Sequence, residues 1–398
     1  MGNFIVFILI LFALAALLRI DFFFSILYLF AGVYVLSHLW SRRMLKNLRI
    51  SRALPQRAFL GDRVTVTLKL ENLSRLPIPW LLLSETLPIA LTSPPFLRQV
   101  ITLSGKASYS LPYTLHARQR GYYLIGPLSL QTGDLLGLKR QLTSSVAADY
   151  LIIYPKIVPI AQLGLPTHSP QVILPTPVPL FQDPARLIGV RDYYPGDNPR
   201  QIHWPATATT GQLLIKQFQP AIARDNVICL NLDRDDYAQH GYPDLAIELA
   251  IVVAASLANH MLGFEKLPVG LSATAIDPLI QSQQDFQLPP RKGRSQLIQI
   301  LEILARVQAA TQTQFLERLR REAVHLSWGT TLMVITSGES PELLETLLLL
   351  KQSGFQPTLV LVKPPGRQQS RVDLTRKLNI PVYRIRREKE VEIWSASP

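Results

Sequence analysis

Three side chains near the middle of the sequence have the types that acid–base catalysis uses. Asp192, Asp197 and His203 lie close together along the chain. A carboxylate and an imidazole that share a site can move a proton to and from a substrate. Between the two aspartates lies Pro195-Gly196, which favours a tight turn because proline fixes φ and glycine tolerates positive φ. This pattern is compatible with a hydrolase.

The same segment has a structural interpretation. Arg191 and Arg200 lie on either side of the turn, where they can form ion pairs with Asp192 and Asp197. Trp204 offers a large apolar side chain to anchor the loop in a core. Because neither a nucleophile nor a phosphate-binding loop accompanies these groups, we favour a loop pinned by ion pairs and a buried indole. The hydrolase remains the alternative.

Other candidate sites are few. Cys229 is the only cysteine, which excludes an intramolecular disulfide and a thiolate-rich zinc site. The histidines are scattered without metal-ligand spacing, and the sequence contains no G-x-x-x-x-G-K-S/T loop for nucleotides. The carboxylates Asp233, Asp235 and Asp236 follow an apolar run; a loosely held cation and a solvated acidic loop both fit them, and we favour the second. The sequence therefore predicts neither a cofactor nor an enzyme.

The acidic run belongs to a C-terminal region, residues 221–386, in which apolar strands alternate with helices. This order predicts an α/β unit with a parallel sheet covered on both faces. The expected strands are 226–232, 267–273, 331–335, 357–362 and 381–385. The expected helices are 244–262, 295–309 and 341–351.

Residues 63–154 show a different periodicity. Short runs alternate between apolar and polar residues and are separated by turn formers, which predicts a β-sandwich-like domain. The expected strands are 63–70, 99–103, 108–115, 122–130 and 151–154. A proline-rich linker, 155–180, follows this domain and leads into the segment 181–220 that contains the turn.

The N-terminal 40 residues predict a two-helix transmembrane hairpin. Apolar runs at about 4–18 and 22–40 are separated by Arg19-Ile20-Asp21, and a membrane-spanning helix needs about 20 apolar residues. A signal peptide is the alternative, but no basic residue precedes the first run and no cleavage site follows it. The basic segment 41–62 then indicates that the main body is cytoplasmic and that the protein is a multi-pass cell-membrane protein.

The formal net charge of +13 requires an explanation. Basic side chains concentrate directly after the second apolar run, where anionic lipid headgroups would attract them. No aromatic and basic surface motif for nucleic acid is evident, so we expect the lipid bilayer and not nucleic acid as the partner of this charge. The basic residues after the second run are Arg42, Arg43, Lys46, Arg49, Arg52 and Arg57.

The segment 181–220 resembles the signature of the domain of unknown function 58 (DUF58) family, approximately G-x-R-E-Y-x-P-G-D-x-x-R-x-I-x-W. Arg120-Gly121-Tyr122-Tyr123 and Gly133-Asp134-Leu135 are similar to the part that precedes it. The chain departs from the family where Pro205 and Thr209 replace basic residues. The matching signature residues are Arg191, Tyr193, Pro195, Gly196, Asp197, Arg200, Ile202 and Trp204.

That resemblance implies a von Willebrand factor A-like fold for the C-terminal unit. In such folds a D-x-S-x-S loop, with a distant threonine and aspartate, binds a divalent cation. Asp233 matches the first position, but Asp235 and Tyr237 replace the serines and Ser337 replaces the later aspartate. We therefore expect a degenerate site and no binding of Mg²⁺ or Mn²⁺ tighter than the millimolar range.

Proteins that resemble this family are typically encoded beside MoxR-type AAA+ ATPases. The resemblance therefore implies a membrane-anchored, non-enzymatic interaction or scaffold protein that acts with such an ATPase. The chain has no nucleotide site of its own, so energy would come from the partner. The expected docking edge is the carboxyl end of the sheet, and its acidic residues are Asp233, Asp235, Asp236 and Glu339.

Overall fold

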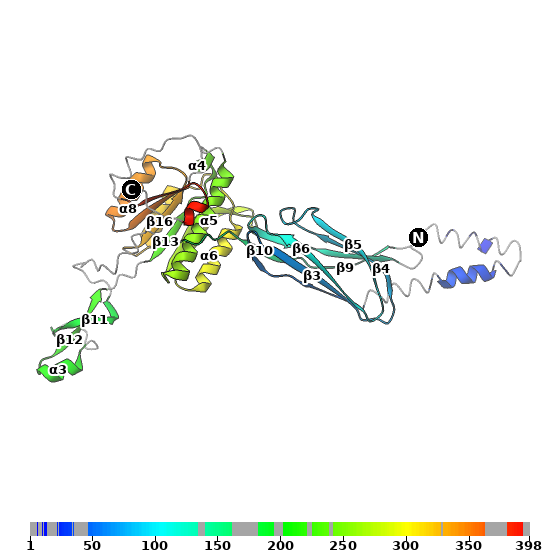
Figure 1. Ribbon diagram of the computed structural model, residues 1–398, viewed down its shortest axis with the longest axis horizontal. Coiled ribbons are helices and arrows are strands. Elements are labelled where there is room, and N and C mark those ends of the chain that lie inside the picture. Colours follow the sequence, from blue (N-terminus) through cyan, green and yellow to red (C-terminus); the bar gives the residue numbers. More distant parts are fainter. Residues whose placement is uncertain are drawn as a thin grey trace. The chain divides into compact units, whose positions relative to one another are not determined.

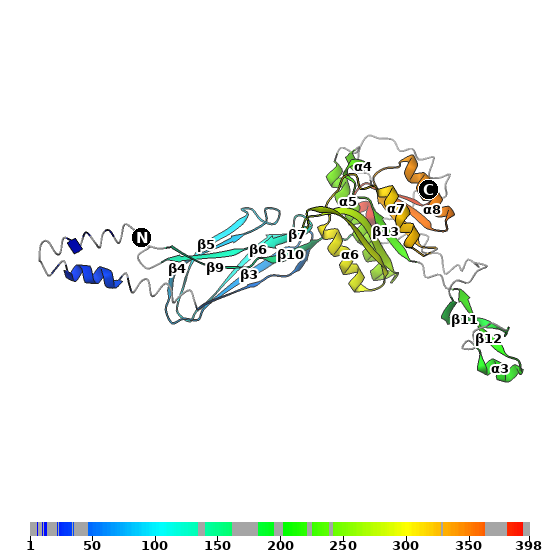
Figure 2. The ribbon, with the colours of Figure 1, turned by 180° about the vertical axis from the view of Figure 1, so that it is seen from behind.

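The computed structural model describes most of the chain (Figures 1 and 2). For most of these residues the side chain is described as well. The structure describes only the backbone at 133, 140–145, 182–188 and 217–220. The chain forms two compact units, Met1–Lys156 with Leu301–Val307, and Ile157–Ile300 with Gln308–Pro398. The described residues are 6, 10, 12, 13, 22, 24–33, 35, 47–133, 140–160, 182–194, 202–220, 225–238, 242–327, 329–362 and 380–392.

Three sheets build the first unit, drawn in blue to cyan in Figure 1. Their strand orders are β1-β3-β6, β2-β10-β7 and β5-β4-β8-β9. All pairings are antiparallel except that of β2 with β10. The strands are β1 (Leu48–Ala53), β2 (Arg57–Phe59), β3 (Arg63–Asn72), β4 (Ile78–Thr86), β5 (Phe96–Leu103), β6 (Ser108–His116), β7 (Gly121–Ile125), β8 (Leu128–Gly133), β9 (Arg140–Val146) and β10 (Asp149–Tyr154).

The alternation of buried and exposed residues along β3 explains how these sheets pack. Val64, Val66, Leu68 and Leu70 are buried, while the residues between them are exposed or partly exposed. Because successive strand residues point to opposite faces, one face of β3 supplies the core. Leu68 and Leu70 pack with Leu81 and other buried residues of β4, β5 and β8. The core of the unit therefore lies between the faces of its sheets.

Two sequence expectations differ from this unit. The run 122–130 is divided between β7 and β8, because Gly126 has a φ of +107° and Pro127 has no N–H to continue the ladder. The strands β1, β2, β4 and β9 were not among the predicted ones. In β4, partly exposed Pro79 and Trp80 obscure the alternation.

Much of the N-terminal region lies outside the described residues, so the two expected helices at 4–18 and 22–40 remain a prediction. Within the described part, Phe24–Val33 is a short apolar helix. One helix of the described residues is long and apolar enough to cross a membrane, Pro243–Phe264, but 78% of its apolar window is buried inside the protein. Its burial marks it as a core helix of the second unit.

A six-stranded sheet with helices forms the second unit, drawn in green to red in Figure 1. The sheet strands are β13 (Asn226–Leu230), β14 (Val269–Asp277), β15 (Ser282–Arg291), β16 (Thr331–Thr336), β17 (Gln356–Val362) and β18 (Val382–Ile385). The helices are α4 (Arg234–Ala238), α5 (Pro243–Asn259), the π-helical turn His260–Phe264, α6 (Arg294–Arg306), α7 (Phe315–His325), α8 (Pro341–Gln352) and α10 (Lys389–Glu392). The part of α6 from Leu301 onward is counted with the first unit.

The order of this sheet is β15-β14-β13-β16-β17-β18. In chain order this is 3-2-1-4-5-6, so the direction of winding reverses between β13 and β16. The expected parallel sheet requires a correction at one edge, since β15 pairs antiparallel with β14. The sequence does not predict β15, because its residues are mostly polar and are exposed at the sheet edge.

Helices cover this sheet as its apolar strands require. Leu319 of α7 and Leu347 of α8 pack with Val227 and Leu332 on one face. The other face is covered by α5, which contacts β13, β16 and β17. Since α5 is buried on nearly all sides, its sequence is apolar throughout and shows no amphipathic stripe.

The described residues of the segment 181–220 form two paired strands and a short helix. β11 (Gln182–Asp192) pairs antiparallel with β12 (Leu214–Pro220), and α3 (Trp204–Thr210) lies between them in the sequence. Gly211 ends α3 with a φ of 72°, in the left-handed region that glycine adopts without strain. The predicted turn at Pro195-Gly196 lies outside the described residues.

Candidate functional site

A pocket opens at the carboxyl ends of β13 and β16, where the winding of the sheet reverses. Its volume is about 540 Å³. Residues that follow β13 and β16 form two of its walls, and the first turn of α7 forms another. Open α/β sheets bind their ligands at this crevice. The fold therefore makes this pocket the first candidate for a functional site.

The amide of Asn231 holds the two strand ends together beneath the pocket. Its Nδ2 donates to Asp236 Oδ2 (2.6 Å) and to Thr336 Oγ1 (3.1 Å). Its Oδ1 accepts from the backbone N–H of Asp233 (2.9 Å). Asn231 is 1% exposed, so these bonds form in a dry environment where they fix the loop geometry. Sequence reasoning missed this residue because it lay inside the expected strand 226–232, whereas β13 ends at Leu230; an amide in an otherwise apolar run was the usable signal.

Asp233 is buried and held by neutral donors. Oδ2 accepts from the backbone N–H of Thr313 (2.6 Å) and from its hydroxyl (3.0 Å), and Oδ1 accepts from the N–H of Asp235 (3.1 Å). In the part of the chain that the structure describes, no lysine or arginine forms an ion pair with this carboxylate. Three hydrogen bonds stabilise its charge without neutralising it.

Asp236 lines the same pocket. The residue keeps exposed surface, but partial burial of its carboxyl raises the pKa, the bond from Asn231 opposes this rise, and the nearby charges of Asp233 and Asp235 add to it. The carboxylate is therefore kept in an environment that disfavours its charge. Such a group would gain stability from a cation brought by a partner.

Two helices begin at the pocket. Ser340 Oγ accepts from the N–H of Leu343 (3.1 Å) and caps α8. Gln314, with a left-handed φ of 50°, precedes α7 without a side-chain cap. Helix N-termini carry partial positive charge, so they favour the acidic side chains that lie here, Asp233, Asp236 and Glu317. Gln314, Glu317 and Ser340 were not among the predicted site residues.

The predicted docking edge is brought together only in part. Asp233, Asp236 and Glu339 line the pocket, and Asp235 is exposed beside it. Glu339 differs from the others, because its side chain is 7% exposed and its Oε1 lies 3.4 Å from Arg384 Nη2. An intramolecular ion pair thus already uses this carboxylate, and the sequence could not show it because Arg384 belongs to a strand far along the chain.

The ligand positions of the expected degenerate metal site have structural roles. Ser337 Oγ donates to the carbonyl oxygen of Asp236 (2.7 Å). Tyr237 is fully buried, and its hydroxyl donates to the carbonyl oxygen of Asn231 (3.0 Å). Burial raises the pKa of Tyr237, which keeps the phenol protonated. Among the described residues no group of three or more His, Cys, Asp or Glu side chains could hold a metal ion.

The described part of the family signature lies on β11, α3 and β12. His203 caps α3 by accepting the N–H of Ala206 at Nδ1 (3.1 Å). Asp192 pairs with Leu214 of β12, whose carbonyl oxygen accepts the N–H of His203. The prediction of a buried indole at Trp204 is wrong, because this residue is 65% exposed. α3 has no buried residue, so the indole meets no core there.

Some of the remaining signature residues are described by the structure and others are not. Arg191 Nη1 donates to the carbonyl oxygen of Asp192 (3.0 Å), and its guanidinium lies 5.9 Å from the ring centroid of Tyr194. Tyr193 donates its N–H to the carbonyl oxygen of Leu213, and Ile202 forms a bridge with Ile215. Pro195, Gly196, Asp197 and Arg200 lie outside the described residues. The predicted ion-pair network and the proton-transfer group therefore both remain predictions.

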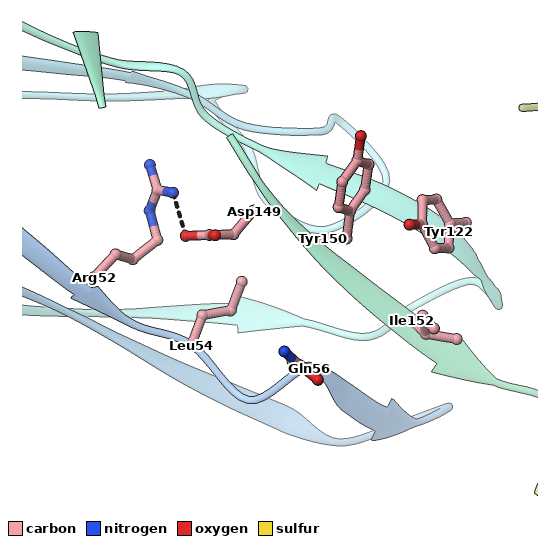
Figure 3. Close-up of a pocket in the computed structure, with 7 residues that line it drawn as sticks. All are labelled: Arg52, Leu54, Gln56, Tyr122, Asp149, Tyr150 and Ile152. Atoms are coloured by element: carbon pink, nitrogen blue, oxygen red, sulfur yellow. Dashed lines mark hydrogen bonds and ion pairs between the residues drawn. The ribbon is translucent and has the colours of Figure 1, made fainter. Parts of the chain in front are cut away.

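A second pocket, of about 440 Å³, lies in the first unit. Figure 3 shows Arg52 directed at Asp149, with Tyr122 and Tyr150 beside them. The charges here are satisfied within the protein: Arg52 Nη1 contacts Asp149 Oδ2 (2.6 Å) and Nη2 contacts Glu85 Oε1 (2.6 Å). The pocket thus offers aromatic surface but little unneutralised charge, unlike the pocket beside β13.

Comparison with known proteins finds a family model that is similar to part of the chain. Residues 189–337 match the model of the family described as "Protein of unknown function DUF58". The uncharacterized protein YeaD of Bacillus subtilis (strain 168) is 23% identical over 318 residues, which cover 79% of this chain and 75% of that protein. The matched region spans most of the signature segment and the first part of the α/β sheet.

Two solved structures are each similar to about a quarter of the chain. The CARDB domain of a Pyrococcus furiosus protein is 15% identical, with a TM-score of 0.21, over 27% of this chain and 91% of that chain. A beta-glucosidase from Listeria innocua is 10% identical, with a TM-score of 0.18, over 27% of this chain and 16% of that chain. At these TM-scores neither structure informs the fold or the function of this chain.

Proposed function

We propose that this chain is a membrane-anchored, non-enzymatic interaction protein that docks a MoxR-type AAA+ ATPase at the pocket beside β13. The DUF58 domain and the sequence resemblance to proteins encoded beside such ATPases support the choice of partner. The N-terminal apolar runs support the anchor, and the basic segment 41–62 supports a cytoplasmic body bound to anionic lipid headgroups. The 3-2-1-4-5-6 strand order supports a von Willebrand A-like unit.

One observation carries the docking site. Asp233 and Asp236 face a pocket at the reversal of the sheet, and no described lysine or arginine pairs with either carboxylate. A protein whose formal net charge is +13 thus keeps an acidic depression at the place where α/β sheets bind ligands. A basic surface of the ATPase would complement it, and salt would weaken the contact.

The test is capture of the purified ATPase by the detergent-solubilised full chain. The variant Asp235→Lys with Asp236→Lys should lose the ATPase, because it places two positive charges where the docking surface needs negative ones. Glu345→Lys with Glu392→Lys is the matched control, since both residues are exposed and lie outside the pocket lining. Equal capture by the two double variants would remove this docking surface from the proposal.

The hydrolase alternative rests on Asp192, Asp197 and His203. The cap at Ala206 counts against it, because His203 Nδ1 already accepts a hydrogen bond that holds α3. A catalytic base would need that nitrogen, or the other nitrogen aimed at a substrate. Asp197→Asn in the full chain distinguishes the two functions: capture of the ATPase should stay unchanged, whereas a hydrolase would lose turnover of a chromogenic ester.

The proposed topology has its own test. Alkaline phosphatase fused after residue 398 should be inactive, because a cytoplasmic body keeps the enzyme in the reducing compartment where its disulfides do not form. An active fusion would place the body outside and overturn the cytoplasmic partner.

A further inference from the structure

One end of the first unit is a rigid platform built around the buried side chain of Asn72. Its Nδ2 donates to the carbonyl oxygens of Leu76 (2.8 Å) and Ser104 (3.0 Å). Its Oδ1 accepts from the N–H (3.0 Å) and the hydroxyl (2.7 Å) of Ser74. Asn72 is 2% exposed and thereby locks the loop after β3 to the loop after β5.

Backbone contacts tighten the same platform. The N–H of Lys106 donates to the carbonyl oxygen of Ser74 (2.8 Å). A side chain at Gly105 would place its Cβ 2.2 Å from the carbonyl oxygen of Arg75, so only glycine lets the two loops approach this closely. The N–H of Leu73 donates to the carbonyl oxygen of Asn47 (2.9 Å), which ties the platform to the point where the chain enters β1.

The platform presents apolar and basic side chains to solvent. Leu73 is 52% exposed even though its neighbours Asn72 and Ser74 are buried. Arg75 and Lys106 are exposed on the two loops, and Arg49 is exposed at the start of β1. A leucine held out by a rigid frame between basic side chains has the composition of a surface that contacts lipid headgroups.

The length of the connecting chain limits how far this platform can lie from the bilayer. The second apolar run ends at Trp40, and Asn47, whose carbonyl oxygen binds the N–H of Leu73, follows seven residues later. Seven extended residues span at most about 25 Å. The intervening residues include Arg42, Arg43 and Lys46, which extend the same basic character. An anchored chain therefore keeps Leu73 within reach of the membrane surface.

We propose that the platform formed by residues 73–76 and 104–107 rests on the anionic membrane surface, with Leu73 inserted among the headgroups and Arg75 and Lys106 bound to lipid phosphates. This inference rests on the proposed membrane anchor. The platform would fix the distance of the first unit from the bilayer, because its hydrogen bonds leave the loops little freedom to bend. Its occupant is lipid, since positive charge and one apolar side chain complement negative headgroups.

The test uses the full chain reconstituted in vesicles that contain phosphatidylglycerol. Leu73→Cys and the control Ile89→Cys are each labelled with an environment-sensitive dye. Ile89 is 76% exposed and follows the opposite end of β4, which makes it a matched site far from the platform. Cys229 is 2% exposed, so the wild-type chain serves as the unlabelled reference. We expect spin-labelled lipids to quench the dye at residue 73 and not at residue 89.

Charge variants complete the test. Arg75→Glu with Lys106→Glu should abolish the quenching at residue 73 in phosphatidylglycerol vesicles, whereas Arg63→Glu with Arg118→Glu, at the other end of the unit, should not. Equal quenching at residues 73 and 89, or equal effects of the two double variants, overturns the platform. An alkaline carbonate wash separates the two proposals: a chain released from the vesicles overturns the anchor as well, whereas a retained chain without quenching overturns the platform alone.

Discussion

Each unit buries a carboxylate in its interior, Glu85 in the first and Asp233 in the second, and these two are stabilised by different means. In the first unit the Glu85 side chain is fully buried, and it binds Arg52 (2.6 Å) and the hydroxyl of Tyr113 (2.7 Å). In the second unit Asp233 is 7% exposed and is held by N–H and O–H donors alone. An opposite charge cancels the field of a carboxylate, whereas neutral donors leave it available to a partner.

The charge of Glu85 is thus part of the core, whereas the charge of Asp233 belongs to the proposed docking site. The pair of Arg52 and Glu85 lies between strands of a core and offers nothing to a second molecule. Asp233 and Asp236 lie at a pocket where the sheet reverses its winding. The comparison predicts different responses of the two regions to substitution, which run from a large loss of stability to a small gain.

The largest effect is expected for Arg52→Ala. This substitution leaves the fully buried Glu85 carboxylate without its cationic partner, so we expect a loss of about 3–5 kcal/mol in the unfolding free energy of the first unit. Lys69→Ala is the matched control, because its ion pair with Glu71 is substantially exposed and should contribute little to stability. Chemical denaturation of the detergent-solubilised chain measures both, and equal losses would show that the buried pair is not special.

A smaller loss is expected for Asp233→Ala. The substitution leaves the N–H groups of Thr313 and Asp235 without their acceptor in a buried place, at a cost of about 1–3 kcal/mol. Asp233→Asn keeps one acceptor oxygen and should cost less. If the asparagine and alanine variants lose equal stability in denaturant, the acceptor oxygen that asparagine keeps contributes nothing, and the bonds from Thr313 and Asp235 are not what stabilises this position.

In the signature segment a polar side chain, that of His203, has a third role as the cap of a helix. His203→Ala removes the acceptor for the N–H of Ala206 and should destabilise the segment by about 1 kcal/mol. His203→Asn supplies another cap and should restore most of this loss. Limited proteolysis after α3 reports the effect, and asparagine behaving no better than alanine would favour a role for the imidazole beyond the cap.

The smallest effect, a gain, is expected for Asp236→Asn. The folded protein raises the pKa of Asp236 above its unfolded value, chiefly by burial, so the charged form opposes folding. This penalty is absent below the unfolded pKa of about 3.9 and grows as the pH rises through the folded pKa. The asparagine variant should therefore melt at a higher temperature at neutral pH and lose this advantage in acid. A lower melting temperature at neutral pH would contradict the unneutralised pocket.

The sequence predicts most of the α/β unit because its strands are continuous apolar runs. The run 226–232 and the run 331–335 correspond to β13 and β16, and Pro341 marks the start of α8. Edge strand β15 was not predicted, because its polar, exposed residues lack the apolar pattern of a central strand. Helix α7 was not predicted, because its many arginine and glutamate residues leave only a narrow apolar stripe.

The candidate site could be predicted only where sequence neighbours form it. Asp233 and Asp236 follow one strand, so their shared location is visible in the sequence. The bond of Asp233 to Thr313 and the pair of Glu339 with Arg384 join distant segments, and only tertiary packing creates them. Trp204 shows the converse error, since a large apolar side chain was assigned to a core that the hairpin does not provide.

The most direct measurement is site-specific photocrosslinking along α7 in living cells. Glu317 lies in the pocket lining with its side chain 66% exposed, and Val324 is 81% exposed farther along the same helix. A benzophenone amino acid at position 317 should crosslink a MoxR-type ATPase, identified by mass spectrometry, and Asp235→Lys with Asp236→Lys should abolish the product. The same amino acid at position 324 should give no such product. Crosslinking of the ATPase at position 324 and not at position 317 would contradict docking at the acidic pocket.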